Sequence, residues 1–467
     1  MIVISFSRVV VSLLIALVAL SVGSVVVHAD DGANSELVTL ILQLLGDEDS
    51  DVRALAFEQI RTEAAGEAAT LEFASQLSKL PAVAKVGLLR ALAARGDGAA
   101  RSAILDQYST ADDSKIKAAA MDAIGAIGRG EDVPLLVEQI AADEKLLADA
   151  ARASLVRLQA ENVHEAIVVQ METVAAATEA QLITILAQRR AVDTLAVLLD
   201  AATDREAVVR QAAMNALGEL AEPTHIASML QGVLAASNGR EREAAEKNVM
   251  FVCNRIERES KRAKPVLNAL PSFSASDQVE LLSTVGRIGG ESARKLVESA
   301  VKSSDQKQHE MGIKALCNWP DASVAEQLIT QIRGDSHASH KLSALRALIR
   351  VAALADGRTD QQKLVLLRRA LGLCQRDTER LYALSRASAI RIPETLRFLL
   401  PYTEQPPYAE AACLAIVELA HHRTLREPNK TEFDTALDKV IARSKDPTVI
   451  DRANRYKKGE TWVRPKK

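Results

Sequence analysis

Apolar residues recur along residues 206–220 with the spacing of one face of an α-helix. They stand at i, i+3, i+4, i+7, i+8 and i+11 and are Val209, Ala212, Ala213, Ala216, Leu217 and Leu220. Such spacing predicts an amphipathic helix whose apolar face lies in the core. The same template occurs in the stretch DDSKIKAAAMDAIGAIG, residues 112–128.

The template returns at nearly constant intervals. Its fifth position holds a large apolar residue, which serves as the marker of each copy, and successive markers are 31 to 36 residues apart. The markers are Ile60, Leu92, Ile124, Leu155, Leu186, Leu217, Val252, Val285, Leu316, Leu348, Leu384 and Ile416. A period of this length is typical of repeat proteins, so we predict an array of about twelve units.

A second apolar segment lies between successive markers, as in VPLLVEQIAA, residues 133–142. Pro134, Pro223 and Pro393 stand near the start of such segments, where proline is tolerated in the first turn of a helix. The alternating pattern of β-strands is absent. The predicted fold is therefore all-α, a right-handed α-solenoid of about twelve stacked helix pairs.

The repeat resembles the HEAT-repeat family, in particular its short bacterial variety, over residues 37–443. The matching stretches are DEDSDVRALAFEQI, DDSKIKAAAMDAIG, DREAVVRQAAMNALG and, more loosely, DQKQHEMGIKALC. The resemblance implies an armadillo-type stack of helix pairs. It also implies a protein-binding role, because that family mostly supplies binding surfaces.

The two ends depart from the repeat. Arg8, a long apolar run and the segment Val27-His28-Ala29 predict an export signal over residues 1–29, cleaved before Asp30. The alternative is an uncleaved membrane anchor. A short N-terminal extension, residues 30–36, precedes the repeats. Residues 444–467 are predicted to be a C-terminal cap with a basic tail.

Composition excludes several partners. The 58 Lys and Arg are balanced by 61 Asp and Glu, a formal net charge of −3, which does not favour nucleic acid. Aromatic residues form only 3% of the chain, too few to suggest a base-stacking surface or a sugar-binding cleft.

Charged residues recur at the start of the marker helices. Acids stand eleven residues before several markers, as at Asp49, Asp113, Glu206 and Asp305, and bases or His309 stand seven before, as at Arg53, Lys117 and Arg210. This order predicts i to i+4 ion pairs that support the helix start. The alternative is a line of basic residues for an acidic partner.

A small residue follows most markers, which predicts close approach of neighbouring helices. The residues in this slot include Gly125, Gly218, Gly286, Ala93, Ala187, Cys253 and Cys317. Cys253 and Cys317 are two repeats apart, too far for a disulfide. A disulfide between Cys374 and Cys413 stays open.

No catalytic, cofactor-binding or metal site is predicted. The stretch GAIGRG, residues 125–130, ends a helix and follows no strand, unlike a dinucleotide-binding loop. The dipeptides His164-Glu165 and His309-Glu310 lie in different registers, so they do not form one di-iron centre. His337 and His340, with Asp335, have metal-compatible spacing but are interpreted as exposed polar residues at a helix start. His421 and His422 are adjacent and point to different sides of a helix.

The C-terminal segment supplies the candidate partner-binding residues: Tyr456, Lys457, Lys458, Trp462 and Arg464. They form either part of a terminal cap or a contact arm for an anionic partner. Trp462 favours docking because an indole is unfavourable in water.

The sequence therefore predicts a non-catalytic protein–protein interaction scaffold or adaptor in the cell envelope or secreted fraction. Its partner is expected to be another exported protein, without nucleic acid or cofactor, and a membrane is involved only if the signal is uncleaved. The alternative is a HEAT-repeat enzyme, either of the lyase type that attaches bilins or of the metal-dependent hydroxylase type, or a helper subunit of an enzyme.

Overall fold

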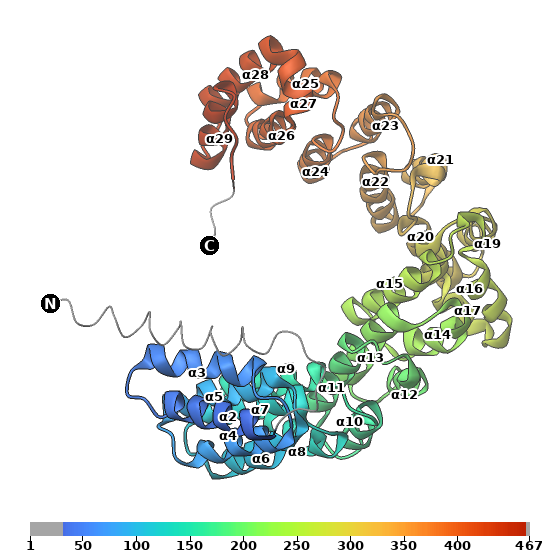
Figure 1. Cartoon of the computed structure of the whole chain (residues 1–467). Coiled ribbons are helices and arrows are strands. Elements are labelled where there is room, and N and C mark those ends of the chain that lie inside the picture. The colour runs from blue at the N-terminus through green and yellow to red at the C-terminus, as the bar shows by residue number, and fades with distance from the viewer. Residues whose placement is uncertain (1–30, 464–467) are drawn as a thin grey trace. The chain divides into compact units, whose positions relative to one another are not determined.

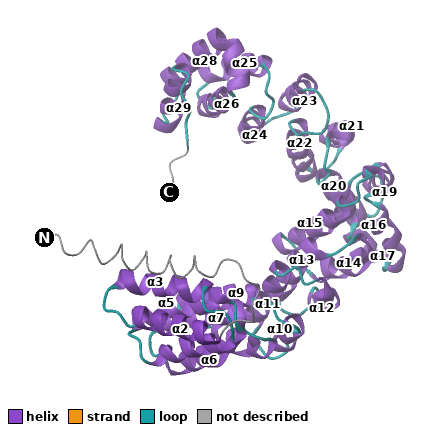
Figure 2. Cartoon of the chain, viewed as in Figure 1, coloured by secondary structure: helices purple, strands orange, loops and turns teal. Residues whose placement is uncertain are grey.

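The computed structural model describes residues 31–463, and every regular element in that range is a helix (Figure 1, Figure 2). The predicted signal segment, residues 1–29, lies outside the described residues, as does Arg464. The helices form two compact units that meet in sequence at Thr194 and Leu195. Each unit is an uninterrupted series of helix pairs.

Within residues 31–194, the first unit contains five pairs. In chain order they are α2 (Asp31–Leu45) with α3 (Ser50–Thr62), α4 (Glu67–Ser75) with α5 (Ala82–Arg95), α6 (Arg101–Thr110) with α7 (Ser114–Ile127), α8 (Val133–Ile140) with α9 (Lys145–Arg157), and α10 (Val163–Met171) with α11 (Ala176–Gln188). Short 3-10 turns, such as Gly130–Asp132, lead into several of the first helices.

The second unit continues the series. Its helices are α12 (Leu195–Ala201), α13 (Ala207–Leu220), α14 (Ile226–Ala235), α15 (Arg240–Asn254), α16 (Lys264–Ala269), α17 (Ala275–Glu280), α18 (Leu282–Ile288), α19 (Glu291–Val301), α20 (Gln306–Cys317), α21 (Ala325–Gly334), α22 (Ala338–Ala352), α23 (Asp360–Gly372), α24 (Asp377–Ala387), α25 (Pro393–Leu399), α26 (Ala409–His421), α27 (Arg423–Arg426), α28 (Lys430–Arg443) and α29 (Pro447–Lys457).

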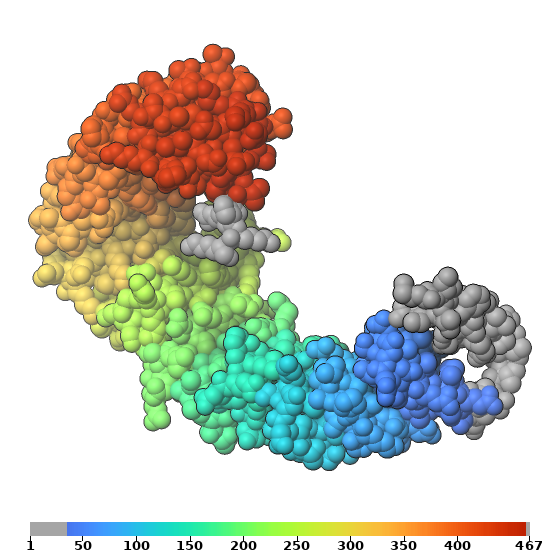
Figure 3. All heavy atoms as spheres, turned by 90° about the vertical axis from the view of Figure 1, so that its left-hand side faces the viewer, coloured from blue at the N-terminus to red at the C-terminus, as the bar shows by residue number. Residues whose placement is uncertain are grey.

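Two kinds of contact build each unit. The two helices of a pair pack together, as α8 does with α9 and α21 with α22. The second helix of a pair also packs against the second helix of the next, as in α5 with α7 and α13 with α15. In the space-filling view the colours follow chain order within each unit, as expected when each repeat contacts its neighbours in sequence (Figure 3).

The predicted markers lie in the core of this stack. All twelve are in second helices, and none is more than 2% exposed. They include Val252 and Leu384, which adjoin the two apparent insertions in the repeat. The all-α solenoid of HEAT-like helix pairs is therefore confirmed, and the apolar face that revealed the repeat is the face that fills its core.

The small slot after the marker is confirmed as a point of close helix approach. A Cβ atom on Gly125 would lie 2.7 Å from the Cα of Ser154 in the next second helix. At Gly286 a Cβ would lie 2.1 Å from the carbonyl oxygen of Ala315. Glycine is required at these positions by the space between helices and not by its backbone freedom.

The predicted ion pairs at the helix starts are wrong. Asp49 is the N-cap of α3, and its carboxylate accepts a backbone N–H of the first turn at 2.8 Å, a stronger use of an acid at this position. Glu206 lies 3.6 Å from Arg205, and Arg210 instead donates to the carbonyl of Asp204 at 2.7 Å. Arg210, the base seven residues before the marker, thus donates to carbonyl oxygens of the loop before its own helix.

Helix ends are joined across repeats by arginines that the sequence analysis did not single out. Arg255, directly after α15, donates to the carbonyls of Gly218 and Glu219 at the end of α13, at 2.6 and 2.7 Å. These carbonyls have no partner within their own helix, and they form its negative end. Equivalent contacts to the preceding second helix are made by Arg95, Arg189 and Arg350.

All four cysteines are free thiols. Cys374 and Cys413, whose pairing the sequence left open, are each buried and unpaired. Burial raises the pKa of Cys253 and Cys317 to about 12. Thiols with such a pKa stay protonated and unreactive at neutral pH, as expected of small core residues.

Candidate functional site

Tyr456, a predicted partner-binding residue, lies inside the last repeats. Its side chain is 1% exposed, and its hydroxyl oxygen is 2.9 Å from Nδ1 of His421 in α26. The guanidinium of Arg426 lies 5.2 Å from the centre of its ring. Tyr456 therefore fastens α29 to α26 and is not available on the surface to a partner, which corrects its assignment as a contact residue.

The other predicted contact residues differ from Tyr456. Lys458 is exposed, and Lys457 is partly exposed and pairs with Asp438 of α28. Trp462 is partly exposed, with its ring 4.7 Å from the guanidinium of Arg452. Through this cation–π contact the indole packs against a side chain of its own chain. These three side chains remain candidates for partner binding, whereas Arg464 lies outside the described residues.

The two His-Glu dipeptides belong to different units. His164 belongs to α10 in the first unit and lies 2.9 Å from a carboxylate oxygen of Asp193. His309 belongs to α20 in the second unit. Each histidine therefore has its own partners within its unit.

The structure brings His309 instead to the two histidines of the next repeat. Asp335 and His337 lie in the turn between α21 and α22, and His340 is in the first turn of α22. His309, Asp335, His337 and His340, here termed the histidine cluster, each offer a ligand-type atom, and these four atoms lie within 4.8 Å of one another. No metal ligand was predicted at these positions, and no sequence motif connects His309 with this turn.

The carboxylate of Asp335 is the centre of the cluster. Its Oδ2 lies 3.1 Å from Nδ1 of His340 and 3.4 Å from Nε2 of His309, and its Oδ1 lies 3.3 Å from Nδ1 of His337. The Asp335 side chain is only 1% exposed. Asp335 and the 15%-exposed His340 are thus not exposed polar residues of a helix start, and only the half-exposed His337 fits that interpretation.

Hydrogen bonding keeps this buried carboxylate ionised. Burial by itself raises the pKa of Asp335, but the backbone N–H of His337 donates to Oδ1 at 2.7 Å and the imidazoles of His340 and His337 approach both oxygens. Their combined effect exceeds that of burial and lowers the pKa below its usual range. A charged carboxylate therefore faces three imidazoles.

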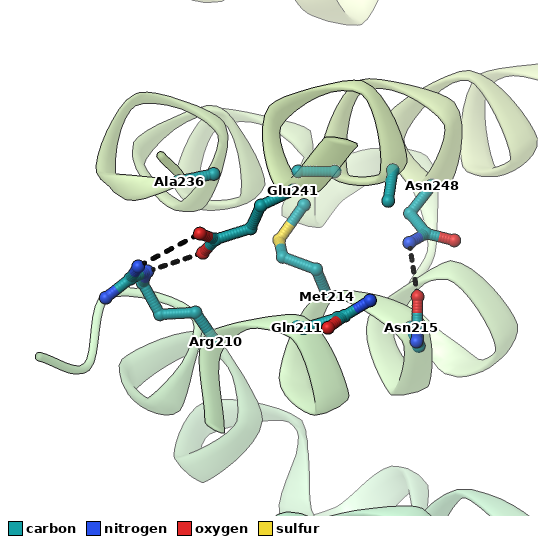
Figure 4. A pocket seen from close by; sticks show the side chains of 9 residues that line it. Arg210, Gln211, Met214, Asn215, Ala236, Glu241 and Asn248 are labelled. Atoms are coloured by element: carbon teal, nitrogen blue, oxygen red, sulfur yellow. Dashed lines mark hydrogen bonds and ion pairs between the residues drawn. The ribbon is translucent and has the colours of Figure 1, made fainter. Parts of the chain in front are cut away.

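A related arrangement joins α13 to α15, where Arg210 occupies the same position in its repeat as His309. Arg210 donates through Nε and Nη2 to the two carboxylate oxygens of Glu241, at 2.8 and 3.2 Å (Figure 4). Glu241 also accepts the backbone N–H of Ser237 at 3.1 Å. Beside the pair, a cavity of about 10 Å³ is lined by Met214 and Asn248. Such a space admits at most one water molecule, so it is a packing feature and not a ligand site.

We expect Arg210→Ala to destabilise the second unit by about 3 kcal/mol, because it leaves the carboxylate of Glu241 without its partner in a nearly buried place. The side chains of Arg210 and Glu241 are 9% and 15% exposed. Arg205→Ala is the matched control, since that side chain is 91% exposed, and it should change stability by less than about 0.5 kcal/mol. Urea unfolding measures both, and equal losses would contradict the structural role of the pair.

The same pair should make stability depend on acid pH. Burial raises the pKa of Glu241, but donation by Arg210 and Ser237 outweighs it, so the folded pKa is lowered. The pair's contribution is present above the unfolded pKa of about 4.3 and disappears as pH falls through the lower folded value. The difference in stability between the wild type and Arg210→Ala should therefore shrink at low pH.

The larger hollows of the described residues have mixed linings. One of about 460 Å³ in the first unit is lined by Arg129 and Gly130, the end of the GAIGRG stretch, but also by Glu131, Glu161 and Glu165. Three carboxylates repel phosphate, which agrees with the rejection of a phosphate loop. Another of about 330 Å³ lies between α22 and α24 and combines Leu342 and Leu345 with Arg376 and Glu379.

No helix among residues 31–463 is long and apolar enough to cross a membrane. The apolar N-terminal segment, on which the export prediction and its anchor alternative depend, precedes this range.

Comparisons with known proteins find similarity only to solved structures. No protein family and no curated protein sequence matches the chain. The karyopherin Kap121p bound to the extreme C-terminus of the protein phosphatase Cdc14p is similar with a TM-score of 0.45 and 10% identity, over 88% of this chain and 54% of that chain. Kap95p, whose binding induces the switch loops of RanGDP to adopt the GTP-bound conformation, is similar with a TM-score of 0.44 and 13% identity, over 91% and 65%.

Importin beta is similar with a TM-score of 0.38 and 13% identity, over 90% of this chain and 68% of that chain. The chain spans about half the length of Kap121p. Scores at this level describe a general likeness between long arrays of paired helices and assign no function to this chain.

Proposed function

We propose that the chain is a non-catalytic protein–protein interaction scaffold or adaptor that acts in the cell envelope or secreted fraction. The observation that carries the proposal is a row of solvent-facing side chains on the second helices, two residues before every marker except Val285, where Ser283 is buried. The markers are uniformly apolar and buried, whereas this row is chemically varied. The fold fixes the markers but leaves the row free to specify a partner.

In the second unit the row combines charge with large apolar groups. Its exposed or partly exposed members are Asn215, Met250, Lys314, Arg346, Tyr382 and Leu414. Phe251, beside Met250, is 51% exposed and adds an aromatic ring. Aromatic residues, methionine and arginine are enriched where proteins bind one another, so this composition suits a protein partner.

The first unit carries a corresponding row of different character: Glu58, Arg90, Asp122, Ala153 and Thr184. It is more polar and lacks aromatic groups. We therefore assign the principal contact to the second unit. The export part of the proposal depends on residues 1–29 and is tested separately, by the cellular fraction that holds the protein and by its N-terminal residue, expected to be Asp30.

Affinity capture tests the scaffold function. The chain from Asp30 serves as bait for the envelope and secreted fractions of its own cell, and one stoichiometric protein partner is expected. Phe251→Glu should reduce the captured partner more than about 10-fold, the effect of losing one strong contact. Val365→Glu is the matched control, because Val365 is also 51% exposed but lies on α23, a first helix.

Three outcomes are informative. Loss with Phe251→Glu but not with Val365→Glu supports binding by the second helices. Loss with only Val365→Glu would move the contact to the first helices and contradict the assigned row. Failure to capture any protein from either fraction would overturn the scaffold function itself.

A further inference from the structure

The strongest unassigned feature is the histidine cluster, because one of its rings has a fixed hydrogen-bond role. Nδ1 of His309 lies 2.6 Å from the carbonyl oxygen of Val301. A carbonyl oxygen only accepts hydrogen bonds, so Nδ1 must carry a proton. In the neutral ring the bare nitrogen is then Nε2, which lies 3.4 Å from Oδ2 of Asp335. Two acceptors this close in a partly buried place require a positive charge, supplied either by a bound cation or by a proton.

Arg210 brings to the corresponding position a permanent positive charge, which His309 lacks. Arg210 donates through Nη1 to a carbonyl of the loop before its own helix and through Nε to the carboxylate of Glu241 in the next repeat. Its guanidinium carries a permanent positive charge, so the contact with Glu241 is complete. His309 likewise contacts a carbonyl before its own helix and a carboxylate of the next repeat, but it brings no permanent charge to Asp335.

We propose a mononuclear binding site for Zn²⁺, or for a divalent transition ion of similar preference, formed by His309, Asp335, His337 and His340. Three imidazoles and one carboxylate make an N₃O ligand set, which suits Zn²⁺ and excludes Ca²⁺ and Mg²⁺, because those ions require oxygen ligands. The ion supplies the positive charge that faces both the His309 lone pair and the buried Asp335 carboxylate.

The distances of the histidine nitrogens from the Asp335 carboxylate are those expected around a tetrahedral ion. Zn–N and Zn–O bonds of about 2.0–2.1 Å place neighbouring ligand atoms about 3.3 Å apart. Nε2 of His309 and Nδ1 of His340 lie 3.4 and 3.1 Å from Oδ2 of Asp335. His337 lies 3.3 Å from the other oxygen, and its ring is half-exposed and so has room to turn toward the ion.

Two further features distinguish this cluster from a chance group of polar residues. The bond from His309 Nδ1–H to the Val301 carbonyl is the contact that commonly orients a metal-bound imidazole. The ligands also come from two successive repeats, α20 and the turn into α22, which pack directly against each other. Binding the ion therefore ties two repeats together, which links the site to the stability of the second unit.

Protonation is the competing source of positive charge. The three ring centres lie only 4.7 to 6.4 Å apart, so a second imidazolium would be repelled by the first. A metal ion binds all three rings in their neutral form and uses every ligand atom. The experiment must therefore measure metal binding itself and not a change in stability with acid.

The test is calorimetric titration of the untagged chain from Asp30, stripped of metal with a chelator, with Zn²⁺ alone. One equivalent is expected to bind, and Co²⁺ should give the visible absorption of a tetrahedral ion at the same stoichiometry. Asp335→Asn, His340→Gln and His337→Gln should each weaken Zn²⁺ binding more than about 10-fold. Circular dichroism without metal confirms that these variants are folded, and half-exposed His337 is the substitution least able to disturb the fold.

His164→Gln is the matched control, because it removes an isolated His–Asp pair in the first unit and should leave the titration unchanged. Absence of stoichiometric Zn²⁺ binding would overturn the proposal in favour of a protonated cluster. Unchanged binding in folded Asp335→Asn and His337→Gln variants would also overturn it, because the ion would then be held elsewhere. The scaffold function is independent of either result.

Discussion

Replacing Gly286 with leucine is expected to unfold the middle of the second unit. Even the Cβ atom of alanine would lie 2.1 Å from the carbonyl oxygen and 2.6 Å from the Cα of Ala315, well inside contact distance. These are backbone atoms of α20 and cannot turn aside, so α18 and α20 must separate. Gly286→Ala should cost about 3 kcal/mol, and leucine more, because overpacking in a dense core displaces whole helices.

Hydrogen exchange is the sharpest measurement, because a repeat protein need not unfold as one unit. Backbone amides of α18 and α20 should lose protection first, while α3 to α9 in the first unit keep theirs. Gly372→Ala is the control, since nothing lies within 4 Å of the added methyl group at the exposed end of α23. It should leave stability unchanged or raise it by about 0.5 kcal/mol. Wild-type protection in Gly286→Leu would show that the two helices are not in close contact.

The fold was predictable because the repeat multiplies a weak signal. One apolar face at i, i+3 and i+4 is ambiguous, but markers at nearly constant intervals are not, and each of them is buried. The glycine slot was predictable for the same reason, since Gly125, Gly218 and Gly286 share one position relative to their markers. Position within the repeat determined burial, because neighbouring repeats use equivalent surfaces.

The histidine cluster was missed although the same logic reveals it. His309 and His340 are 31 residues apart, one of the two most frequent intervals between markers, so adjacent repeats place them side by side. The shared His-Glu motif suggested a relation between His309 and His164. The 31-residue spacing that relates His309 to His340 in the next repeat was therefore overlooked. The burial of Asp335 was not predictable, because it depends on how the turn after α21 folds back.

The hydrogen-bond partners of charged side chains could not be predicted from the sequence either. Asp49 and Arg53 have ideal spacing for an ion pair, yet each finds a backbone partner instead. Unsatisfied N–H and carbonyl groups at helix ends compete for the same side chains and gain more from them than an exposed ion pair does. Spacing alone does not rank these alternatives.

Tyr456 was misassigned as a contact residue for a similar reason. Val449, Ala453 and Tyr456 follow the core spacing i, i+4 and i+7, and all three are buried in α29. This short apolar pattern was overlooked because it is interrupted by arginines such as Arg452, which is expected to lie on the surface. In the structure Arg452 is 7% exposed and donates to Glu418 at 2.6 Å. A charged residue that contacts the preceding repeat belongs to the packing of the array.

Tyr456→Ala should therefore destabilise the C-terminal end of the array by about 3–4 kcal/mol, the cost of removing a buried aromatic side chain. It removes the ring that lies between α26 and α29 and leaves His421 without its hydroxyl partner. Tyr456→Phe keeps the ring and should lose only about 1 kcal/mol. Thermal unfolding, together with exchange of the α28 and α29 amides, measures the difference.

Trp462→Ala distinguishes the role of a cap from that of a contact arm, because Trp462 is partly exposed and its ring lies against Arg452. It should change stability by less than about 1 kcal/mol, the value of one exposed cation–π contact. If the segment after α29 also binds a partner, Trp462→Ala and Lys458→Glu lower partner capture while the melting temperature stays near that of the wild type. Unchanged capture in both variants would leave α29 as a cap alone, and a loss of stability in Trp462→Ala equal to that in Tyr456→Ala would place the indole in the core. The two aromatic residues thus test different functions of one short segment, because one is buried by the array and the other stands at its surface.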